Sequence, residues 1–225
     1  MYGSDALGGV IILDQATIPE RNTWGVSVDF TGRTNNSLLG RSLNVYGRND
    51  GFFVSARATY MDYGDYRIPS DSVDIYSYKA PLHKHRLRNT AGRESALHLE
   101  AGWLKNSFST RFFISRLENL NGFFANAHGL EPRMVDTELH DQSSRDILYP
   151  YHQVSHLKFI NRSTWRSVHH TLEAEIGFQR NFRQEWSQFL NHGYMPAVFP
   201  DMLPFPSDLE QQFEKYTYTG NVRST

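Results

Sequence analysis

Histidines are the residues of this sequence best suited to chemistry, and three of them fall in long polar stretches. His128, His140 and His192 are candidate ligand-binding residues, since an imidazole in an external loop can ligate haem iron. No histidine pair at helical spacing and no carboxylate-rich cluster accompanies them, so ordinary polar loop residues are the competing interpretation. His169 and His170 are expected in a strand, where neighbouring side chains point to opposite faces and cannot chelate one ion. The sequence therefore predicts no metal site and no cofactor.

Aromatic residues gather in the segment "HGYMPAVFPDMLPFPSD", residues 192–208. Tyr194, Phe199 and Phe205 offer large contact areas at low entropic cost, which makes them candidates for lining the entrance to a ligand site. Packing within the loop is the alternative interpretation. The polar segment "ANAHGLEPRMVDTELHDQSSRD", residues 125–146, is a second candidate ligand loop.

Enzymatic chemistry has little support. Ser155 and His156 are adjacent in one expected strand, so their side chains diverge, and no G-x-S-x-G motif is present. The opening "YGSDALGGVIIL", residues 2–13, has Gly3, Gly8 and Gly9, which is not the spacing of a phosphate-binding loop. We therefore expect a protein that is not an enzyme.

The composition excludes several further classes. The 225 residues carry a net charge of −1, so no electrostatic case exists for nucleic acid as a partner. There is no cysteine, and no apolar run approaches the 18 or so residues of a transmembrane helix. Aromatic residues make up 14%, and many Tyr and Phe with modest apolar content favour strands over helices.

Apolar and polar residues alternate with a period of two, which predicts β-strands. Leu97, Leu99 and Ala101, for example, alternate with His98 and Glu100. The expected strands are 22–33, 38–48, 51–63, 94–106, 107–119, 152–162, 167–181 and 211–225. Many are longer than the usual strand of about 5–6 residues and match the roughly 9–11 residues that cross a bilayer at a tilt.

The connections alternate between short and long. Short turns are expected at 48–50, 105–107 and 163–166, and long segments at 67–93, 120–151 and 187–209. A compact soluble domain rarely has three such loops, whereas a transmembrane β-barrel has short turns on one side of the membrane and long loops on the other. Only the first outer connection, near residues 34–36, is expected to be short.

Charged residues follow the same alternation. Lipid-facing Arg or Lys at mid-depth costs about 2–4 kcal/mol, so charges within the strands are expected on the inward face. The expected inward charges are Arg57, Glu100, Arg111, Glu173 and Glu175. Arg41 departs from the pattern, because it alternates in phase with Leu39 and Leu43, and it requires either a position near the membrane interface or a β-bulge.

The opening segment resembles the last strand of the plug domain of TonB-dependent outer-membrane receptors. The plug-motif residues are Tyr2, Gly3, Ser4, Ala6, Gly8 and Gly9, followed by Val10 and Ile11. The segments "LRNTAGRE" (87–94), "HDQSSRDILYPYHQVSHLKF" (140–159) and "GFQRNFRQEWSQF" (177–189) are also similar to this family.

The resemblance implies an all-β fold, an antiparallel meander that forms part of a transmembrane β-barrel. Residues 1–20 are then the C-terminal end of a plug, and 21–225 the first eight or so strands of a larger barrel. It also implies an outer-membrane, TonB-coupled active transporter of a scarce nutrient: a ferric siderophore, haem, cobalamin or a carbohydrate. The expected partners are the TonB energy-coupling complex, the nutrient and outer-membrane lipid. A self-contained small outer-membrane barrel and a soluble β-sheet binding module remain the alternatives.

Overall fold

The computed structural model describes residues 18–127, 135–188 and 208–225, and its main feature is one eight-stranded antiparallel sheet. The strand order is β1-β2-β3-β6-β7-β8-β9-β10, so each strand pairs with its sequence neighbours in the sheet. The strands are β1 Thr23–Arg33, β2 Leu38–Asn49, β3 Phe52–Tyr63, β6 Gly92–Leu104, β7 Phe108–Gly122, β8 Tyr151–Arg166, β9 Thr171–Trp186 and β10 Leu209–Ser224. The predicted all-β antiparallel meander is therefore confirmed.

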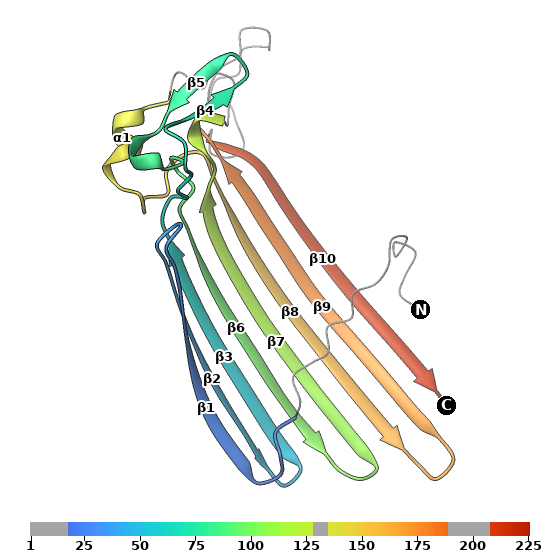
Figure 1. Ribbon diagram of the computed structural model, residues 1–225. Helices are drawn as coiled ribbons and strands as arrows, with labels where there is room; N and C mark the ends of the chain where they lie inside the picture. Colours follow the sequence, from blue (N-terminus) through green and yellow to red (C-terminus); the bar gives the residue numbers. More distant parts are fainter. Residues whose placement is uncertain (1–17, 128–134, 189–207) are drawn as a thin grey trace, which may run out of the picture.

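The sheet is open in the described part of the chain. β1 and β10 lie at its opposite edges, and each has one paired neighbour only, β2 and β9 respectively (Figure 1). The register is continuous from β1 to β9, and one irregularity, between Leu209 and Gln211, interrupts the pairing of β10 with β9. No bulge accommodates Arg41, which stays on the same face as Leu39 and Leu43.

The short and long connections lie at opposite ends of the sheet, as predicted (Figure 1). Residues 50–51, 105–107 and 167–170 make the turns at the lower end, and 34–37, 64–91, 123–150 and 187–208 make the connections at the other. We call this second end the loop end. The long connections contain elements that the alternation did not predict. These are the hairpin β4 (Ser72–Ile75) and β5 (Tyr78–Pro81), the 3-10 turns η1 (His83–His85) and η2 (Ala125–Ala127), and helix α1 (Thr137–Gln142).

One predicted turn was wrong. Residues 163–166 continue β8, and the turn instead occupies 167–170, where the Ser167 backbone N–H donates to the His170 carbonyl at 2.8 Å. His169 and His170 therefore lie in a turn and not in a strand. In the sequence "STWRSVHHTLE" apolar and polar residues alternate both before and after the turn, so the pattern does not locate it. The turn also lacks Gly, Pro, Asn and Asp, the residues that usually mark turns.

The two faces of the sheet have opposite chemistry. One row of cross-strand neighbours is apolar on all eight strands: Val26, Val45, Ala56, Leu99, Ile114, Phe159, Phe178 and Tyr218. The adjacent row, which points to the other face, is polar on all eight: Ser27, Asn44, Arg57, His98, Ser115, Lys158, Gln179 and Thr217. We call these the apolar face and the polar face. The predicted inward charges all lie on the polar face.

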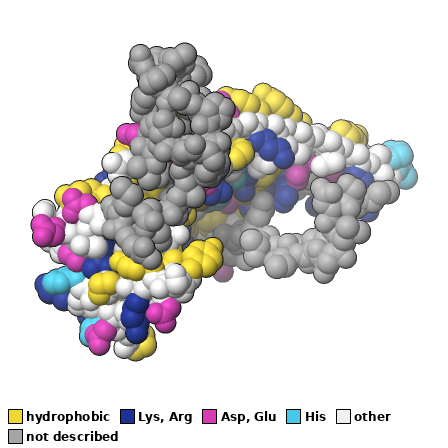
Figure 2. All heavy atoms as spheres, turned by 90° about the horizontal axis from the view of Figure 1, so that it is seen from above, with side chains coloured by type: hydrophobic (Ala, Val, Ile, Leu, Met, Phe, Trp, Pro, Cys, Tyr) yellow, Lys and Arg dark blue, Asp and Glu magenta, His cyan; other side chains and the backbone are white. Residues whose placement is uncertain are grey.

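The apolar face is exposed. Trp24 and Phe30 are 82% and 81% exposed, and most of the large exposed hydrophobic side chains of the described residues belong to this face. Figure 2 views the molecule from the loop end and shows hydrophobic side chains gathered in patches at its edges, with charged side chains between them. No helix among the described residues is long and apolar enough to span a membrane.

Glycines on the polar face make room for aromatic rings. Three of them lie directly opposite an aromatic partner: Gly25–Tyr46, Gly102–Phe53 and Gly92–Tyr63. A Cβ on Gly102 would lie 2.5 Å from the Phe53 ring and 2.6 Å from the Thr110 carbonyl oxygen, so this position excludes a side chain. A ring can therefore lie across its neighbouring strand, and Phe53 is almost completely buried although it lies on the polar face, as does buried Phe113.

Candidate functional site

The long connections 64–91 and 123–150 pack together at the loop end and form what we call the loop platform (Figure 1). The platform is joined to the first hairpin of the sheet. The Gly64 backbone N–H donates to the Asn36 carbonyl at 2.8 Å, and the Asp65 N–H donates to the Ser144 carbonyl at 2.7 Å. Arg145 pairs with Asp62 and also donates to the Ser37 carbonyl at 2.6 Å. Hydrogen bonds and an ion pair thus join segments that are far apart in the sequence.

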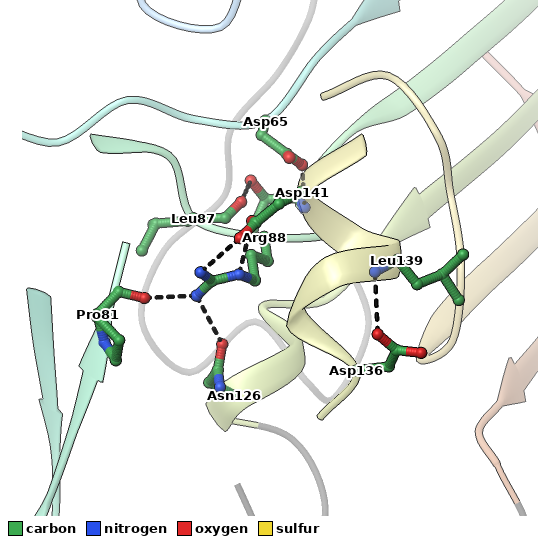
Figure 3. Close-up of polar contacts among 9 residues, drawn as sticks. Asp65, Pro81, Leu87, Arg88, Asn126, Asp136, Leu139 and Asp141 are labelled. Carbon is green, nitrogen blue, oxygen red and sulfur yellow. Dashed lines mark hydrogen bonds and ion pairs between the residues drawn. The ribbon is translucent and has the colours of Figure 1, made fainter. Parts of the chain in front are cut away.

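Arg88 is the centre of this platform (Figure 3). Its guanidinium, only 5% exposed as a side chain, donates to both carboxylate oxygens of Asp141, Nε to Oδ1 at 2.7 Å and Nη2 to Oδ2 at 2.9 Å. Nη1 donates to the Pro81 carbonyl at 2.6 Å and to Asn126 Oδ1 at 3.4 Å. A planar fork of donors fits a carboxylate in this bidentate manner, which lysine cannot reproduce. Arg88 therefore fastens β5, η2 and α1 together.

Asn89 fastens the same two connections at a second point. Its Nδ2 donates to the Pro150 carbonyl at 2.7 Å and the Phe123 carbonyl at 3.1 Å, and its Oδ1 accepts from the Leu148 N–H at 2.8 Å. The residue has a φ of 63°, a left-handed conformation that asparagine tolerates better than most residues. Its backbone lies so close to Gly122 that a Cβ there would be 2.1 Å from the Asn89 carbonyl oxygen.

Asp65 holds the C-terminal end of the connection 64–91. Its carboxylate is buried and accepts from the backbone N–H groups of Thr90 at 2.7 Å and Ala91 at 3.0 Å. Burial raises the pKa of Asp65 from 3.8 to about 6, while the two backbone hydrogen bonds and the Arg86 charge act in the opposite direction. The effect of burial on the pKa of Asp65 thus outweighs the opposite effect of the two hydrogen bonds.

His140 is the one predicted ligand-binding residue that the structure describes. It lies in the last turn of α1, a six-residue helix whose N-cap, Asp136, accepts from the Leu139 N–H at 2.9 Å. Burial, followed by the nearby Arg88 charge, lowers the pKa of His140 and favours the neutral imidazole. His140 therefore lies beside the Arg88–Asp141 pair, inside the platform.

The other predicted binding residues, His128, His192, Tyr194, Phe199 and Phe205, lie outside the described residues, as does the plug motif, Tyr2, Gly3, Ser4, Ala6, Gly8 and Gly9. These assignments remain predictions. Within residues 18–127, 135–188 and 208–225, no group of three or more His, Asp or Glu side chains is placed to hold a metal ion.

The residues that fix the platform were not predicted from their chemistry. Arg88 and Asn89 belong to "LRNTAGRE", and Asp141, Leu148 and Pro150 belong to "HDQSSRDILYPYHQVSHLKF". Both segments were noted for resemblance only, and the structure shows that each holds the other in place.

The polar face contributes a second set of interactions below the platform. Buried Glu100 pairs with Arg111 through Nε at 2.9 Å, and the Arg111 guanidinium also lies 5.0 Å from the centre of the Phe113 ring. Arg57 pairs with Asp29 at 3.2 Å, and Arg162 pairs with Glu175. Two of these pairs join neighbouring strands, and the Arg57–Asp29 pair reaches from β3 to β1 across β2.

A hollow of roughly 700 Å³ lies on the polar face at the lower end of β1, β2, β3 and β6. Its lining includes Tyr46, Phe53 and Arg57 and, from the segment that leads into β1, Ile18, Pro19 and Glu20. The segment is held by Arg48, whose Nη1 donates to the Pro19 carbonyl at 3.2 Å. The chain before β1 thus approaches from the polar side of the sheet.

Comparisons of the chain with protein-family models, with curated proteins and with solved structures find no match.

Proposed function

We propose that this chain forms part of the wall of an outer-membrane β-barrel transporter of the TonB-dependent kind. Its loop platform would support the loops that bind a scarce nutrient, a ferric siderophore, haem, cobalamin or a carbohydrate. A plug preceding β1 would gate the passage under control of the TonB complex. The observation that carries the proposal is the pair of adjacent rows, one apolar and one polar across all eight strands.

The exposed apolar face supports a lipid environment. A soluble monomer rarely exposes an apolar patch of more than a few hundred Å², and a soluble β-sandwich covers such a face with a second sheet. The other sheet among the described residues is the two-stranded β4–β5 hairpin at the loop end, which packs in the platform. Acyl chains would remove this face from water without a second layer of protein, and this weighs against the soluble binding module.

The polar face supports a lumen that contains water or a plug. Charges there are paired across strands, and the segment before β1 approaches from this side. The open edges of β1 and β10 leave two rows of backbone groups that further strands must pair in a membrane. That requirement favours a larger barrel over a self-contained eight-stranded one.

The lipid-facing assignment is tested by spin labels placed one at a time at Leu97, Leu99 and Ala101 and, as matched controls on the polar face of the same strand, at Ala96 and His98. The full-length protein is reconstituted in phospholipid nanodiscs, and collision with oxygen is compared with collision with a water-soluble nickel chelate. We expect the odd-numbered positions to be accessible to oxygen and the even-numbered ones to the chelate. Chelate accessibility at both sets would contradict the proposal.

Transport itself is tested by uptake of labelled haem, a ferric siderophore, cobalamin and an oligosaccharide into cells that carry the full-length protein. Accumulation of one cargo that stops when the proton-motive force is collapsed supports active transport. Accumulation that continues unchanged without that force would indicate a passive channel and remove the TonB-coupled part of the proposal.

A further inference from the structure

One row of side chains marks the loop end of the apolar face. Its members, cross-strand neighbours from β1 to β10, are Phe30, Arg41, Tyr60, Ser95, Glu118, Ser155, Phe182 and Glu214. We call it the rim row. The next row toward the turns still includes exposed Leu43, Leu97 and Leu157. The same row also contains Arg116 and Arg180, so charged side chains begin in it and continue in the rim row.

A hollow of roughly 500 Å³ opens at this row over β3, β6, β7, β8 and β9. Two small residues, Ser95 and Ser155, lie at the hollow, and Arg93 and Gln153 line it on the side of the loops. Tyr60 and Phe182 line its two sides. The rim-row carboxylate of Glu118, between the two serines, lines the hollow as well. The hollow thus combines hydroxyl, amide and guanidinium groups and one carboxylate with aromatic walls, and it adjoins the apolar face directly.

Positively charged side chains outnumber negatively charged ones around the hollow. The carboxylates near it on this face are paired, Glu118 with Arg116, Glu214 with Arg180, and Asp62 with Arg145. Arg41 and Arg93 have no carboxylate partner among the residues that the structure describes. Arg41 lies over the Tyr60 ring at 5.3 Å from its centre, and Arg93 lines the hollow itself. Two guanidinium groups without an ion pair among the described residues therefore lie near Tyr60, and Asp62, the cross-strand neighbour of Arg93, is paired with Arg145.

We propose that this hollow binds the phosphate-bearing head group of a membrane lipid whose acyl chains lie on the apolar face. Guanidinium groups bind phosphate through paired charge-assisted hydrogen bonds, and the two serines and Gln153 supply further hydrogen-bonding groups. The apolar side chains beside the hollow favour a lipid over free phosphate, which has no apolar part. The inference depends on the proposed function, because it requires the apolar face to contact a bilayer.

The test uses native mass spectrometry of the full-length protein in mixed micelles with phosphatidylglycerol, phosphatidylcholine or inorganic phosphate as the probe. We expect retention of phosphatidylglycerol over phosphatidylcholine, and a drop in its affinity of about tenfold or more in Arg41→Gln/Arg93→Gln. Arg166→Gln, which removes one exposed arginine from the turn end of the polar face, is the matched control and should bind as the parent does. Ser95→Phe/Ser155→Phe fills the hollow without changing charge and should also lose the preference for phosphatidylglycerol.

Equal retention of the two lipids, or retention of phosphatidylglycerol by both double variants, would overturn the proposal. Inorganic phosphate that competes with phosphatidylglycerol at equal concentration would assign the site to free phosphate and also overturn it. The spin-label pattern on β6 is measured on the same samples. A preserved alternation with no lipid preference refutes the head-group site alone, whereas loss of the alternation refutes the proposed function.

Discussion

The Arg88–Asp141 pair allows the sharpest test of how the loop platform is held. Asp141→Ala removes both carboxylate acceptors and leaves the 5%-exposed Arg88 guanidinium with only the Pro81 carbonyl and Asn126. Breaking a buried pair in this way costs about 3–5 kcal/mol, because the remaining charge is left uncompensated. At about 1.4 kcal/mol for each factor of ten, the opening equilibrium of the platform should rise by roughly two to three and a half orders of magnitude.

Hydrogen exchange measured by mass spectrometry on the full-length protein in detergent micelles is the appropriate assay, because the platform can open while the sheet stays intact. Peptides from 81–91 and 136–150 should lose protection, and peptides from β8 and β9 should not. Glu118→Ala is the matched control. It breaks the Arg116–Glu118 pair, whose side chains are 60% and 47% exposed, and an exposed pair of this kind contributes at most about 1 kcal/mol.

A double variant completes the cycle. In Arg88→Met/Asp141→Ala the buried charge is gone as well, so much of the protection should return. Exchange of the platform in Asp141→Ala that rises by less than about tenfold, or that matches the Glu118→Ala control, would show that Arg88 does not hold the platform together.

Three further outcomes follow from the same physics. The pKa of the Asp65 carboxyl is about 6 in the folded protein and 3.8 when the group is exposed, so between these values the folded protein keeps a proton that the unfolded chain loses. The stability of the platform should therefore fall by up to about 3 kcal/mol as the pH rises from 4 to 6. Asp65→Asn should abolish this pH dependence in the exchange assay. Gly102→Ala should destabilise the sheet by about 1–3 kcal/mol in urea titration, because its Cβ would overlap the Phe53 ring and a backbone carbonyl oxygen. Glu100→Ala should cost about 3 kcal/mol in the same titration by leaving Arg111 unpaired, and Glu100→Gln less, since its amide oxygen still accepts. A cost below about 1 kcal/mol for Glu100→Ala would show that the pair contributes little to stability.

The eight long strands could be predicted because apolar and polar residues alternate over most of each strand's 11 to 16 residues. Charged residues on the apolar face, such as Arg116 and Arg180, interrupt the alternation toward the loop end. The turn at 167–170 could not be predicted, because a turn without glycine, proline, asparagine or aspartate leaves no local signal. Arg41 was identified as an exception, and its position in the rim row over Tyr60 fits the interface interpretation without a bulge.

The loop platform could not be predicted from the sequence, for a different reason. Arg88 and Asp141 are 53 residues apart, and nothing in a single sequence indicates which of many loop charges will meet. Asp65 likewise looks like any polar residue after a strand, and its raised pKa follows from the segments that bury it. Local periodicity determines strands, whereas a polar site assembled from separate connections depends on tertiary contacts.

The meander order also bears on how such a protein can assemble and change size. Each hairpin of the large sheet pairs residues that are close in the chain or separated by one folded connection, so the sheet can grow by one hairpin at a time with little entropic penalty per step. Every hairpin begins and ends at the same end of the sheet. Gain or loss of a whole hairpin would therefore alter the circumference and leave each remaining loop at the end where it now lies. In the proposed barrel, only the joining of the first strand to the last would involve distant parts of the chain, and that single step would fix the width of the pore.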